Sequence, residues 1–280
     1  MPATIIDGKK IAAELTDKIK SEVAKLPTDK RPGLAVVLVG DNPASQAYVN
    51  SKEKKCLELG YYSVKKELPG TISEAELLKV ITTLNADPKI HGILVQMPLP
   101  KQISDQKVLD AISPEKDVDG LHPLNLGRLL RNEKGIVPCT PKGIIKLIKS
   151  TGVEIAGKNA VVLGRSNLVG KPVAALLTNE NATVTICHSK TVELAAHLKQ
   201  ADIVVLAIGK PGLITGQMLK KGAVVIDVGT TRGADGKLHG DADFDSVVKV
   251  AAYLTPVPGG VGPLTIACLM ENTYEAFRKF

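Results

Sequence analysis

The sequence predicts an α/β protein of two domains, each built around a parallel sheet, with the second sheet doubly wound. Three observations lead to this expectation. Short apolar runs alternate with amphipathic stretches along nearly the whole chain, which is typical of strand–helix–strand units. The 280 residues, 44% of them hydrophobic, suffice for two separate cores. A glycine-bearing strand–turn–helix pattern begins only past the midpoint, at residues 158–170.

The first half of the chain opens with a helix and continues as alternating strands and helices. Residues 7–26 carry apolar side chains about every four positions, as an amphipathic helix does. The run 33–40 is apolar throughout and has glycine at both ends, which indicates a buried parallel strand. Asn42-Pro43 begins the next helix, and Gly60 ends it. Further elements are expected at residues 61–68 (strand), from 73 (helix, with a capping box at 73–76), 91–97 (strand) and 104–112 (helix).

The second half repeats this alternation after a polar, turn-rich stretch at residues 114–125, where the first domain is expected to end. Thr140-Pro141 starts a helix that ends near Gly152. Strands are expected at residues 158–164, 182–187, 202–208 and 223–228, and helices at 169–177 and 192–198. A last helix is expected over residues 263–280. From about residue 264 onward, we expect this helix to pack back on the first domain. We expect a cleft between the two domains.

The charge balance favours small anionic ligands over nucleic acid. Lys and Arg number 36 against 29 Asp and Glu, a formal charge of +7, which serves solubility and also attracts polyanions. The sequence has no Trp, only 3% aromatic residues and no basic run interleaved with aromatic residues. A nucleic-acid partner is therefore not expected.

The N-terminal residues and the cysteines indicate a cytoplasmic protein. Met1-Pro2-Ala3-Thr4 resembles no export signal, and no apolar run approaches the roughly 20 residues of a membrane helix. Cys56, Cys139, Cys187 and Cys268 stand singly, which favours reduced, buried thiols. The five histidines are dispersed, so we expect no metal site.

A nucleotide signal lies in residues 160–170, which read as a strand, a tight turn and a helix start. Gly164 and Gly170 are present, but Ser166 stands where the usual pattern has its second glycine. Helix-terminal N–H groups at such a turn can hold a phosphate. The alternative is an ordinary strand-to-helix turn without a ligand.

The next strand end favours NADP over NAD. A site for NAD usually carries Asp or Glu there, but this chain has His188-Ser189-Lys190. Arg165, directly after the first glycine of the turn, can reach the same place and grip a 2′-phosphate. His188 alone would be an ordinary loop histidine. Glycines at two further strand ends, Ile208-Gly209 and Gly229-Thr230, allow the backbone to approach a nicotinamide ribose.

A candidate catalytic helix follows the first buried strand. Ser45, Tyr48 and Lys52 fall at i, i+3 and i+7 and so share one helix face. An aromatic plane beside an ammonium can stack on a flat ring and bring a charge to it. The alternative is a solvated face, since two more lysines follow. Against that alternative, the helix starts at the carboxyl end of a strand, where open α/β sheets place their ligands.

Three more segments are candidates. Gln96 ends another buried strand and points beyond the sheet edge, although it could be an ordinary strand-end amide. Asp117 and Asp119 lie in a turn, where local capping is the common explanation. Residues 256–263 form a rigid loop rich in glycine and proline whose amides either bind a ligand or merely shape the chain.

Several of these segments occur together in one known family. The segments are residues 45–52, 85–99, 116–121, 138–143, 164–166, 187–191 and 256–265. The loop Pro258-Gly259-Gly260-Val261-Gly262-Pro263 is highly specific. On this basis the chain resembles, over nearly its whole length, the bifunctional methylenetetrahydrofolate dehydrogenase (NADP+)/methenyltetrahydrofolate cyclohydrolase family, the FolD type.

The resemblance implies roles for individual residues. Lys52 is the general acid/base of the hydrolytic step, Gln96 holds and tunes it, and Tyr48 stacks on the folate. Asp119 binds the pterin's amino and ring N–H groups. The catalytic set is therefore Lys52, Gln96, Asp119 and Tyr48; the substrate-binding set is Tyr48, Ser45, Gln96, Leu99, Asp119, Pro258, Gly259 and Gly260; and the cofactor-binding set is Gly164, Arg165, Ser166, Ser189 and Thr230. The family often has Ile where this chain has Thr230, which puts that one contact in doubt.

The resemblance also implies an activity. The enzyme would oxidise 5,10-methylenetetrahydrofolate with NADP and hydrolyse the methenyl product to 10-formyltetrahydrofolate, both reversibly, and so supply one-carbon units for purine biosynthesis. Residues 1–119 would form the folate-binding catalytic domain and residues 120–280 the Rossmann-type NADP-binding domain. A homodimer through the cofactor half is implied. Two alternatives stay open: an NADP dehydrogenase of another small substrate, such as a shikimate-type enzyme, and a catalytically silent folate- or NADP-binding regulator.

Overall fold

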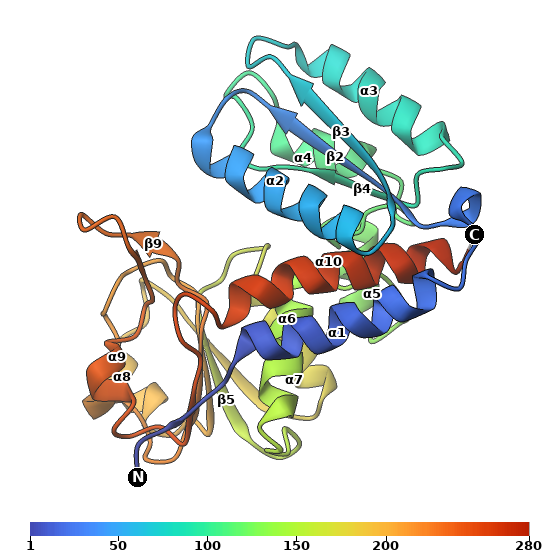
Figure 1. Cartoon of the computed structure of the whole chain (residues 1–280). Helices are drawn as coiled ribbons and strands as arrows, with labels where there is room; N and C mark the ends of the chain where they lie inside the picture. The colour runs from blue at the N-terminus through green and yellow to red at the C-terminus, as the bar shows by residue number, and fades with distance from the viewer. Residues whose placement is uncertain (280) are drawn as a thin grey trace. The chain divides into compact units, whose positions relative to one another are not determined.

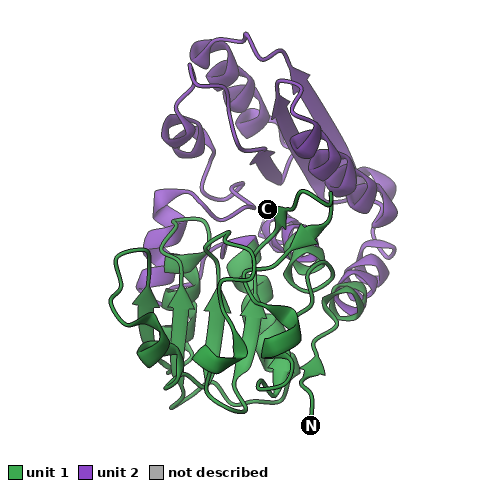
Figure 2. Ribbon diagram, turned by 90° about the vertical axis from the view of Figure 1, so that its left-hand side faces the viewer, with its two compact units in different colours: residues 1–13, 140–265 green, residues 14–139, 266–280 purple. Residues whose placement is uncertain are grey.

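The computed structural model describes residues 1–279, which form two compact units (Figure 2). Unit 1 comprises residues 1–13 and 140–265, and unit 2 comprises residues 14–139 and 266–280. The chain passes between the units three times, within α1 (Gly8–Val23), at the start of α6 (Cys139–Ser150) and within α10 (Val261–Phe277). The units differ from the expected ranges 1–119 and 120–280 at the first 13 residues and at residues 120–139, and the part of the last helix from Ile266 groups with unit 2.

Unit 2 is built on a small sheet of three parallel strands (Figure 1). The strand order is β3-β2-β4, with β2 (Gly33–Val39) between β3 (Tyr62–Leu68) and β4 (Gly92–Val95). Every residue of β2 is buried, as its unbroken apolar run predicts.

Successive side chains of β2 feed two different cores, because side chains alternate across a strand. Leu34, Val36 and Leu38 pack with residues of α1, α2 (Pro43–Glu58) and α10. Ala35, Val37 and Val39 pack with α3 (Glu74–Ala86) and α4 (Asp105–Ala111) on the other face. The small sheet is thus covered by helices on both sides.

Local signals in the sequence set the helix ends in unit 2. The Asn42 side chain accepts hydrogen bonds from the backbone N–H groups of Ala44 and Ser45 and starts α2. Ser73 and Glu76 form the expected capping box of α3. A further helix, α5 (Pro123–Leu130), lies largely beyond the stretch expected to be turns, and the sequence pattern did not predict it.

Unit 1 is built on a sheet of six parallel strands in the order β1-β11-β8-β7-β5-β6. Strands β5 (Asn159–Leu163), β6 (Thr183–Cys187), β7 (Ile203–Leu206) and β8 (Val224–Asp227) lie where the sequence predicts them. Two strands of two residues each were missed, β1 (Thr4–Ile5) and β11 (Tyr253–Leu254). The doubly wound parallel sheet is confirmed.

The connections of unit 1 are mostly helical: α6 (Cys139–Ser150), α7 (Gly170–Asn179), α8 (Leu194–Leu198) and α9 (Phe244–Val247). One connection contains an antiparallel hairpin of β9 (Thr231–Arg232) with β10 (Leu238–His239). Short 3-10 helices are η2 (Gly216–Met218) in unit 1 and η1 (Thr28–Lys30) in unit 2. The helix expected to reach Phe280 is observed to Phe277, and Phe280 lies outside the described residues. All four cysteines are buried, and none of them forms a disulfide. None of the helices within residues 1–279 is both long and apolar enough to span a bilayer.

Candidate functional site

The carboxyl edge of the small sheet brings two candidate segments together. Strands β2 and β4 are neighbours in the sheet but not in the chain, and open α/β sheets form ligand crevices between such strands. After β2 the chain turns at Gly40, whose φ is +83°, and enters α2. Gln96 follows directly after β4. The turn after β2 and the end of β4 therefore place α2 and Gln96 at the same edge.

One face of α2 is turned inward. Its buried residues are Ser45, Val49, Lys52 and Cys56, spaced four, three and four positions apart. Lys52 retains only 9% of its exposure, whereas Tyr48 retains 49%. The expected shared face is therefore correct for Ser45 and Lys52, and Tyr48 lies at its exposed margin, where its ring can be covered by a ligand.

Lys52 and Gln96 are in direct contact. The Lys52 amine donates a hydrogen bond to Gln96 Oε1 at 2.8 Å. Gln96 Nε2 donates in turn to the carbonyl of Met97 at 2.7 Å, which fixes the amide so that its oxygen faces the lysine. The Gln96 backbone is anchored by its N–H to the carbonyl of Val37 at 2.8 Å. The strand end thus orients the partner of the amine.

Burial shifts the titration of Lys52 and Asp119 towards their neutral forms. Loss of water around the Lys52 amine lowers its pKa, and the nearby Asp119 and Cys139 oppose this shift. Burial likewise raises the pKa of Asp119, opposed by the charge of Lys52 and by a hydrogen bond with Cys139. A lysine with a lowered pKa can act as a base nearer to neutral pH.

The segment that carries Asp119 is fixed by a buried amide from α10. Asn272, with 0% exposure, donates to the carbonyls of Val118 and Val137, each at 2.9 Å. The Cys139 thiol donates to the same Val118 carbonyl at 3.2 Å. Asn272 and Cys139 therefore fix the backbone at Val118, the residue before Asp119, and Asn272 also ties it to the backbone at Val137.

The two carboxylates of the turn have separate roles. Asp117 accepts hydrogen bonds from the N–H of His122 at 2.8 Å and from Asn125 Nδ2 at 2.9 Å. This is the local capping that a turn aspartate commonly performs. Burial raises the pKa of Asp117 to about 6. Of the pair, Asp119 is the one that interacts with Lys52.

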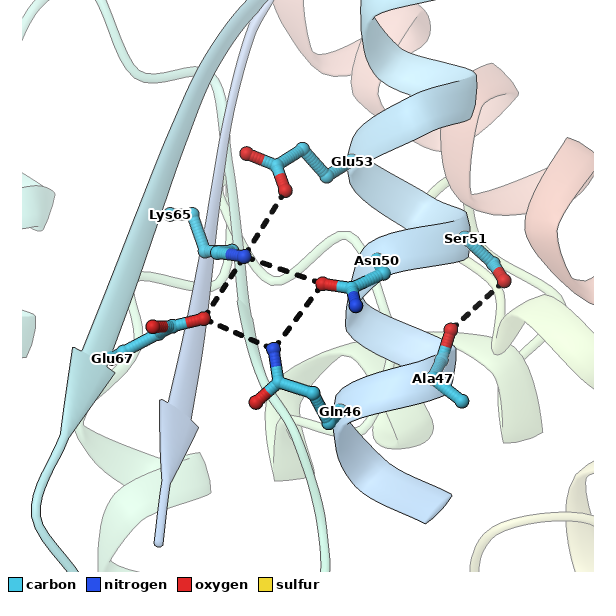
Figure 3. Close-up of polar contacts among 7 residues, drawn as sticks. All are labelled: Gln46, Ala47, Asn50, Ser51, Glu53, Lys65 and Glu67. Atoms are coloured by element: carbon cyan, nitrogen blue, oxygen red, sulfur yellow. Dashed lines mark hydrogen bonds and ion pairs between the residues drawn. The ribbon is translucent and has the colours of Figure 1, made fainter. Parts of the chain in front are cut away.

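A second face of α2 is tied to β3 by exposed polar side chains (Figure 3). The Lys65 amine lies 2.9 Å from Glu67, 3.3 Å from Glu53 and 3.2 Å from Asn50 Oδ1. Gln46 Nε2 joins the group by donating to Asn50 at 3.2 Å and to Glu67 at 3.0 Å. This network helps to hold α2, and with it Tyr48 and Lys52, against the sheet.

The remaining residues of the expected substrate set fall in both units. Leu99 is partly buried and packs against the core under α3 and α4 of unit 2. Pro258, Gly259 and Gly260 belong to unit 1, in the loop that leads into α10. Gly259 has a φ of +111°, and Gly260 donates its N–H to the carbonyl of Pro256 at 2.9 Å. The loop is a tight turn that depends on its glycines.

The glycine turn of unit 1 follows β5 and lies beside the chain that leaves β7. Strands β5 and β7 are again neighbours in the sheet but not in the chain. Gly164 has a φ of +133°, and a Cβ there would collide with the carbonyl of Ala207. A Cβ on Gly170 would collide with the carbonyl of Gly164. Both positions therefore require glycine. The Ser166 hydroxyl accepts from the N–H groups of Val169 at 3.1 Å and Gly170 at 3.4 Å, which leaves its O–H as a donor.

Cofactor candidates around this turn are exposed. Arg165 and Ser189 each follow one of two paired strands, β5 and β6, two residues after the paired Leu163 and Cys187. Thr230 is exposed after β8. His188 is satisfied within its loop, since its Nδ1 accepts the N–H of Lys190 at 3.2 Å. The ordinary loop explanation therefore holds for this histidine.

Two buried aspartates shape the neighbouring loops. Asp241, with 0% exposure, accepts the N–H groups of Ile208 at 2.8 Å, Gly209 at 3.2 Å and Lys210 at 2.7 Å. Asp227, at the end of β8, accepts those of Gly229, Asp241 and Ala242 within 2.9 Å. Burial raises the pKa of Asp227 to about 6. The loops after β7 and β8 are thus fixed by carboxylates rather than by regular pairing.

Two known family domains match most of the chain. Residues 6–119 match the catalytic domain of tetrahydrofolate dehydrogenase/cyclohydrolase, and residues 138–280 match its NAD(P)-binding domain. The chain belongs to the tetrahydrofolate dehydrogenase/cyclohydrolase family. The bifunctional protein FolD of Moorella thermoacetica is 58% identical over all 280 residues, covering 100% of both chains.

Two solved structures of family members superpose closely. FolD from Campylobacter jejuni has a TM-score of 0.97 at 46% identity and covers 99% of each chain. FolD from Trypanosoma brucei, solved with NADP cofactor and an inhibitor, has a TM-score of 0.95 at 43% identity and covers 100% of this chain and 98% of its own. The fold expected from the sequence is therefore that of the family.

Within this member of the family, three residues of the sites were missed from the sequence. Cys139 was noted only as a buried thiol, although the segment Pro138-Cys139-Thr140-Pro141 was among those carrying the resemblance. Asn272 lies in a helix without any pattern that marks it. Asp241 lies in an irregular stretch, and its partners are backbone groups more than 30 residues away.

Proposed function

We propose that this chain is a bifunctional one-carbon folate enzyme. It oxidises 5,10-methylenetetrahydrofolate with NADP and then hydrolyses 5,10-methenyltetrahydrofolate to 10-formyltetrahydrofolate, both steps being reversible, and so feeds purine biosynthesis. Family membership and 58% identity over the whole length to a bifunctional FolD support this proposal. The observation that carries it is the buried Lys52 amine, hydrogen-bonded to Gln96 and lowered in pKa.

Lys52 serves the hydrolytic step. Water adds to the cationic methenyl carbon, and the neutral amine accepts one of the water protons. When the bond from that carbon to N5 breaks, the ammonium returns the proton to N5, and the remaining hydroxyl proton leaves to solvent as the formyl carbonyl forms. Burial supplies the neutral amine that the first of these transfers needs.

The neighbours of Lys52 position the amine and the folate. Gln96 Oε1 accepts from the amine in either protonation state, so it holds the group without adding a charge. Tyr48 offers an exposed ring for stacking, and Asp119 accepts the pterin's amino and ring N–H groups. Ser45, Leu99 and the loop of Pro258, Gly259 and Gly260 complete the proposed substrate set.

The glycine turn of unit 1 fits a dinucleotide. Gly164 and Gly170 leave its backbone bare, and the N-terminus of α7 follows. Ser166 keeps an O–H to donate to a phosphate, and the exposed Arg165 and Ser189 would bind the 2′-phosphate. Thr230, exposed after β8, would contact the nicotinamide ribose. NADP, when bound, supplies the hydride acceptor. The residues contribute orientation, which can be worth about 7–11 kcal/mol at best.

We also propose the domain roles, the assembly and the location. Residues 1–119 hold the folate and residues 120–280 hold NADP, with the last helix returning to the folate domain. A homodimer through the cofactor half is supported by the edge strand β6, whose outer side pairs with no strand within residues 1–279. Ile186 on this strand is 41% exposed, and Val192 beyond it is 78% exposed. The four buried cysteines, none of which forms a disulfide, suit a cytoplasmic protein.

A coupled absorbance assay tests the function. The protein is mixed with 5,10-methylenetetrahydrofolate and either NADP or NAD, and reduced cofactor and methenyl product are followed together. We expect reduction with NADP, slower reduction with NAD, and decay of the methenyl absorbance faster than without protein. Tight folate and NADP binding without turnover would support the silent regulator. Turnover of NADP with shikimate but not with the folate would support the other dehydrogenase.

A further inference from the structure

A large pocket in unit 2 lies at the edge of the small sheet opposite to Lys52. Its volume is about 1040 Å³, and its walls include Tyr62 at the start of β3 and His91 just before β4. Lys52 and Gln96 belong to the carboxyl edge of the same sheet. The pocket is therefore separate from the proposed folate site and has no assigned role.

The pocket is lined by an excess of cations. Four cationic side chains contribute to its walls against two carboxylates, those of Asp29 and Glu115, which gives a net charge of +2 with His91 neutral; the cations are Lys30, Arg31, Lys89 and Lys116. Burial and the charge of Lys116 lower the pKa of His91. Its Nδ1 accepts the N–H of Gly33 at 2.9 Å, so the neutral ring keeps its proton on Nε2.

These four cations differ in the hydrogen bonds and ion pairs that they form. Lys116 donates to the carbonyls of Asn85 and Asp87, each at 2.8 Å, and so forms part of the floor. Lys30 and Lys89 are exposed, and no carboxylate within residues 1–279 pairs with either. Among residues 1–279, Arg31 reaches only the Gly60 carbonyl, at 3.5 Å, and its buried Nε has no hydrogen-bond partner there. Donors held this way suit a ligand with several anionic oxygens.

Ring systems stand beside the cations. Tyr62 keeps 46% of its exposure, and the partly buried Phe277 packs edge-on against His91 with 5.0 Å between ring centroids. A flat ring of a ligand can stack on such a surface. Sites for small molecules usually measure about 300–1,000 Å³, so this pocket has room for a ring and a polyphosphate chain together.

Two segments run side by side from the pocket to the proposed folate site. His91 leads through β4 to Gln96, and Lys116 leads through a short stretch to Asp119. They are joined where Ile93 and Asp117 form a bridge, with the Ile93 N–H donating to the Lys116 carbonyl at 2.7 Å. A ligand that moves His91 or Lys116 thus acts on the backbone that carries two of the catalytic candidates.

We propose that this pocket binds a phosphorylated small molecule with a flat ring, of the nucleotide type. The three loosely engaged cations, Lys30, Arg31 and Lys89, bind the phosphates, and Tyr62 stacks on the ring. Binding at the pocket is a property independent of the reaction proposed above, so it is measured by calorimetry rather than by turnover.

Isothermal titration of adenosine 5′-triphosphate tests the proposal, using protein saturated with NADP so that the glycine turn is occupied. Tripolyphosphate supplies the charge without the ring, and adenosine supplies the ring without the charge. We expect adenosine triphosphate to bind about tenfold or more tightly than tripolyphosphate, and its affinity to fall as salt is raised. We expect adenosine alone to bind at least tenfold more weakly than the triphosphate.

Matched variants locate the binding. The double substitution Lys30→Glu with Lys89→Glu should weaken triphosphate binding about 100-fold, while Lys79→Glu, an exposed lysine of α3 outside the pocket, should leave it unchanged. Tyr62→Ala should remove the advantage over tripolyphosphate, and Tyr62→Phe should restore it. No heat from the triphosphate, an equal loss in the Lys79 variant, or equal affinity for triphosphate and tripolyphosphate would overturn the proposal.

Discussion

In unit 2 the polar side chains at the carboxyl edge of the sheet already contact one another, whereas in unit 1 the corresponding side chains extend into solvent. Lys52 is 9% exposed and bonded to Gln96, but Arg165 and Ser189 are exposed. The fixed part of unit 1 is its backbone, set by Gly164 and by the hydrogen bonds to Asp241.

The difference follows from what each unit has to do. A proton-transferring amine needs a shifted pKa, which requires burial before the substrate arrives. A phosphate arrives with its own charge and needs only donors at the right places, so exposed side chains on a rigid turn suffice. Substitutions in unit 2 should therefore change chemistry, and those in unit 1 should change cofactor affinity or stability.

The largest effect is expected at the buried amine. Lys52→Met removes the acid/base group and should lower the cyclohydrolase rate by about 10²- to 10⁴-fold, while part of the dehydrogenase activity remains, because hydride transfer needs no acid. Separate assays of methenyltetrahydrofolate hydrolysis and NADPH formation measure the two. An equal loss of both activities with NADP binding intact would show that Lys52 has no separate role.

The second effect concerns the rigid backbone of unit 1. Asp241→Ala leaves three backbone N–H groups without their carboxylate and should lower the free energy of unfolding by about 3 kcal/mol, with weaker NADP binding. Chemical denaturation measures the stability. Asp245→Ala, an exposed aspartate of α9, is the control. Matching stabilities of the two variants would argue against carboxylate-fixed loops.

The third effect tests the exposed cofactor cation. Arg165→Ala should raise the KM for NADP about tenfold or more and leave that for NAD nearly unchanged, because only NADP carries the 2′-phosphate. Dehydrogenase assays with both cofactors give the two constants. A similar rise for both would contradict the 2′-phosphate contact.

The fourth effect is a shift with pH. Gln96→Glu places a carboxylate where the amide oxygen meets the Lys52 amine, which favours the ammonium and raises the lysine pKa, opposite to the effect of burial. The rising limb of the cyclohydrolase pH–rate profile should therefore move up by about one pH unit, a tenfold loss on that limb. Gln106→Glu, on the exposed side of α4, should leave the profile in place. An unmoved limb in the Gln96 variant would separate Lys52 from the titration.

The smallest effect is expected in the exposed network of α2 (Figure 3). Lys65→Met removes contacts to Glu53 and Glu67 but should cost less than about 1 kcal/mol, because solvent screens surface ion pairs. Cyclohydrolase turnover should stay within about twofold. A loss approaching that of Lys52→Met would mean that the network, and not burial, positions the amine.

The sequence predicted the longer strands of both sheets and missed the strands of two residues. Strand β2 was evident because a strand buried on both faces is apolar throughout, and α3 because Ser73 and Glu76 form its capping box. Strands β1 and β11 have two residues each, too few for a periodic pattern. Helix α5 has the start signals His122 and Pro123, but they lie within a turn-rich stretch that hid them.

The residues of the site likewise divide into those that the sequence indicates and those that it does not. Lys52 and Gln96 were separate candidates because the helix of Lys52 follows one buried strand and Gln96 ends another. Their pairing came from the family resemblance. Asn272 was not a candidate, because its partner Val118 lies 154 residues away and is a backbone carbonyl, which leaves no mark in the sequence. Roles for individual residues came from the resemblance, and they stay predictions.

Both ends of the chain are needed to complete the units. Strand β1 pairs with β11, and α10 supplies Cys268, Leu269 and Met270 to the core beneath β2. A nascent chain leaving the ribosome therefore cannot fully cover this face of its first-made sheet until its last helix has been synthesised. Until then the apolar underside of β2 lacks part of its cover and can associate with other exposed apolar surfaces.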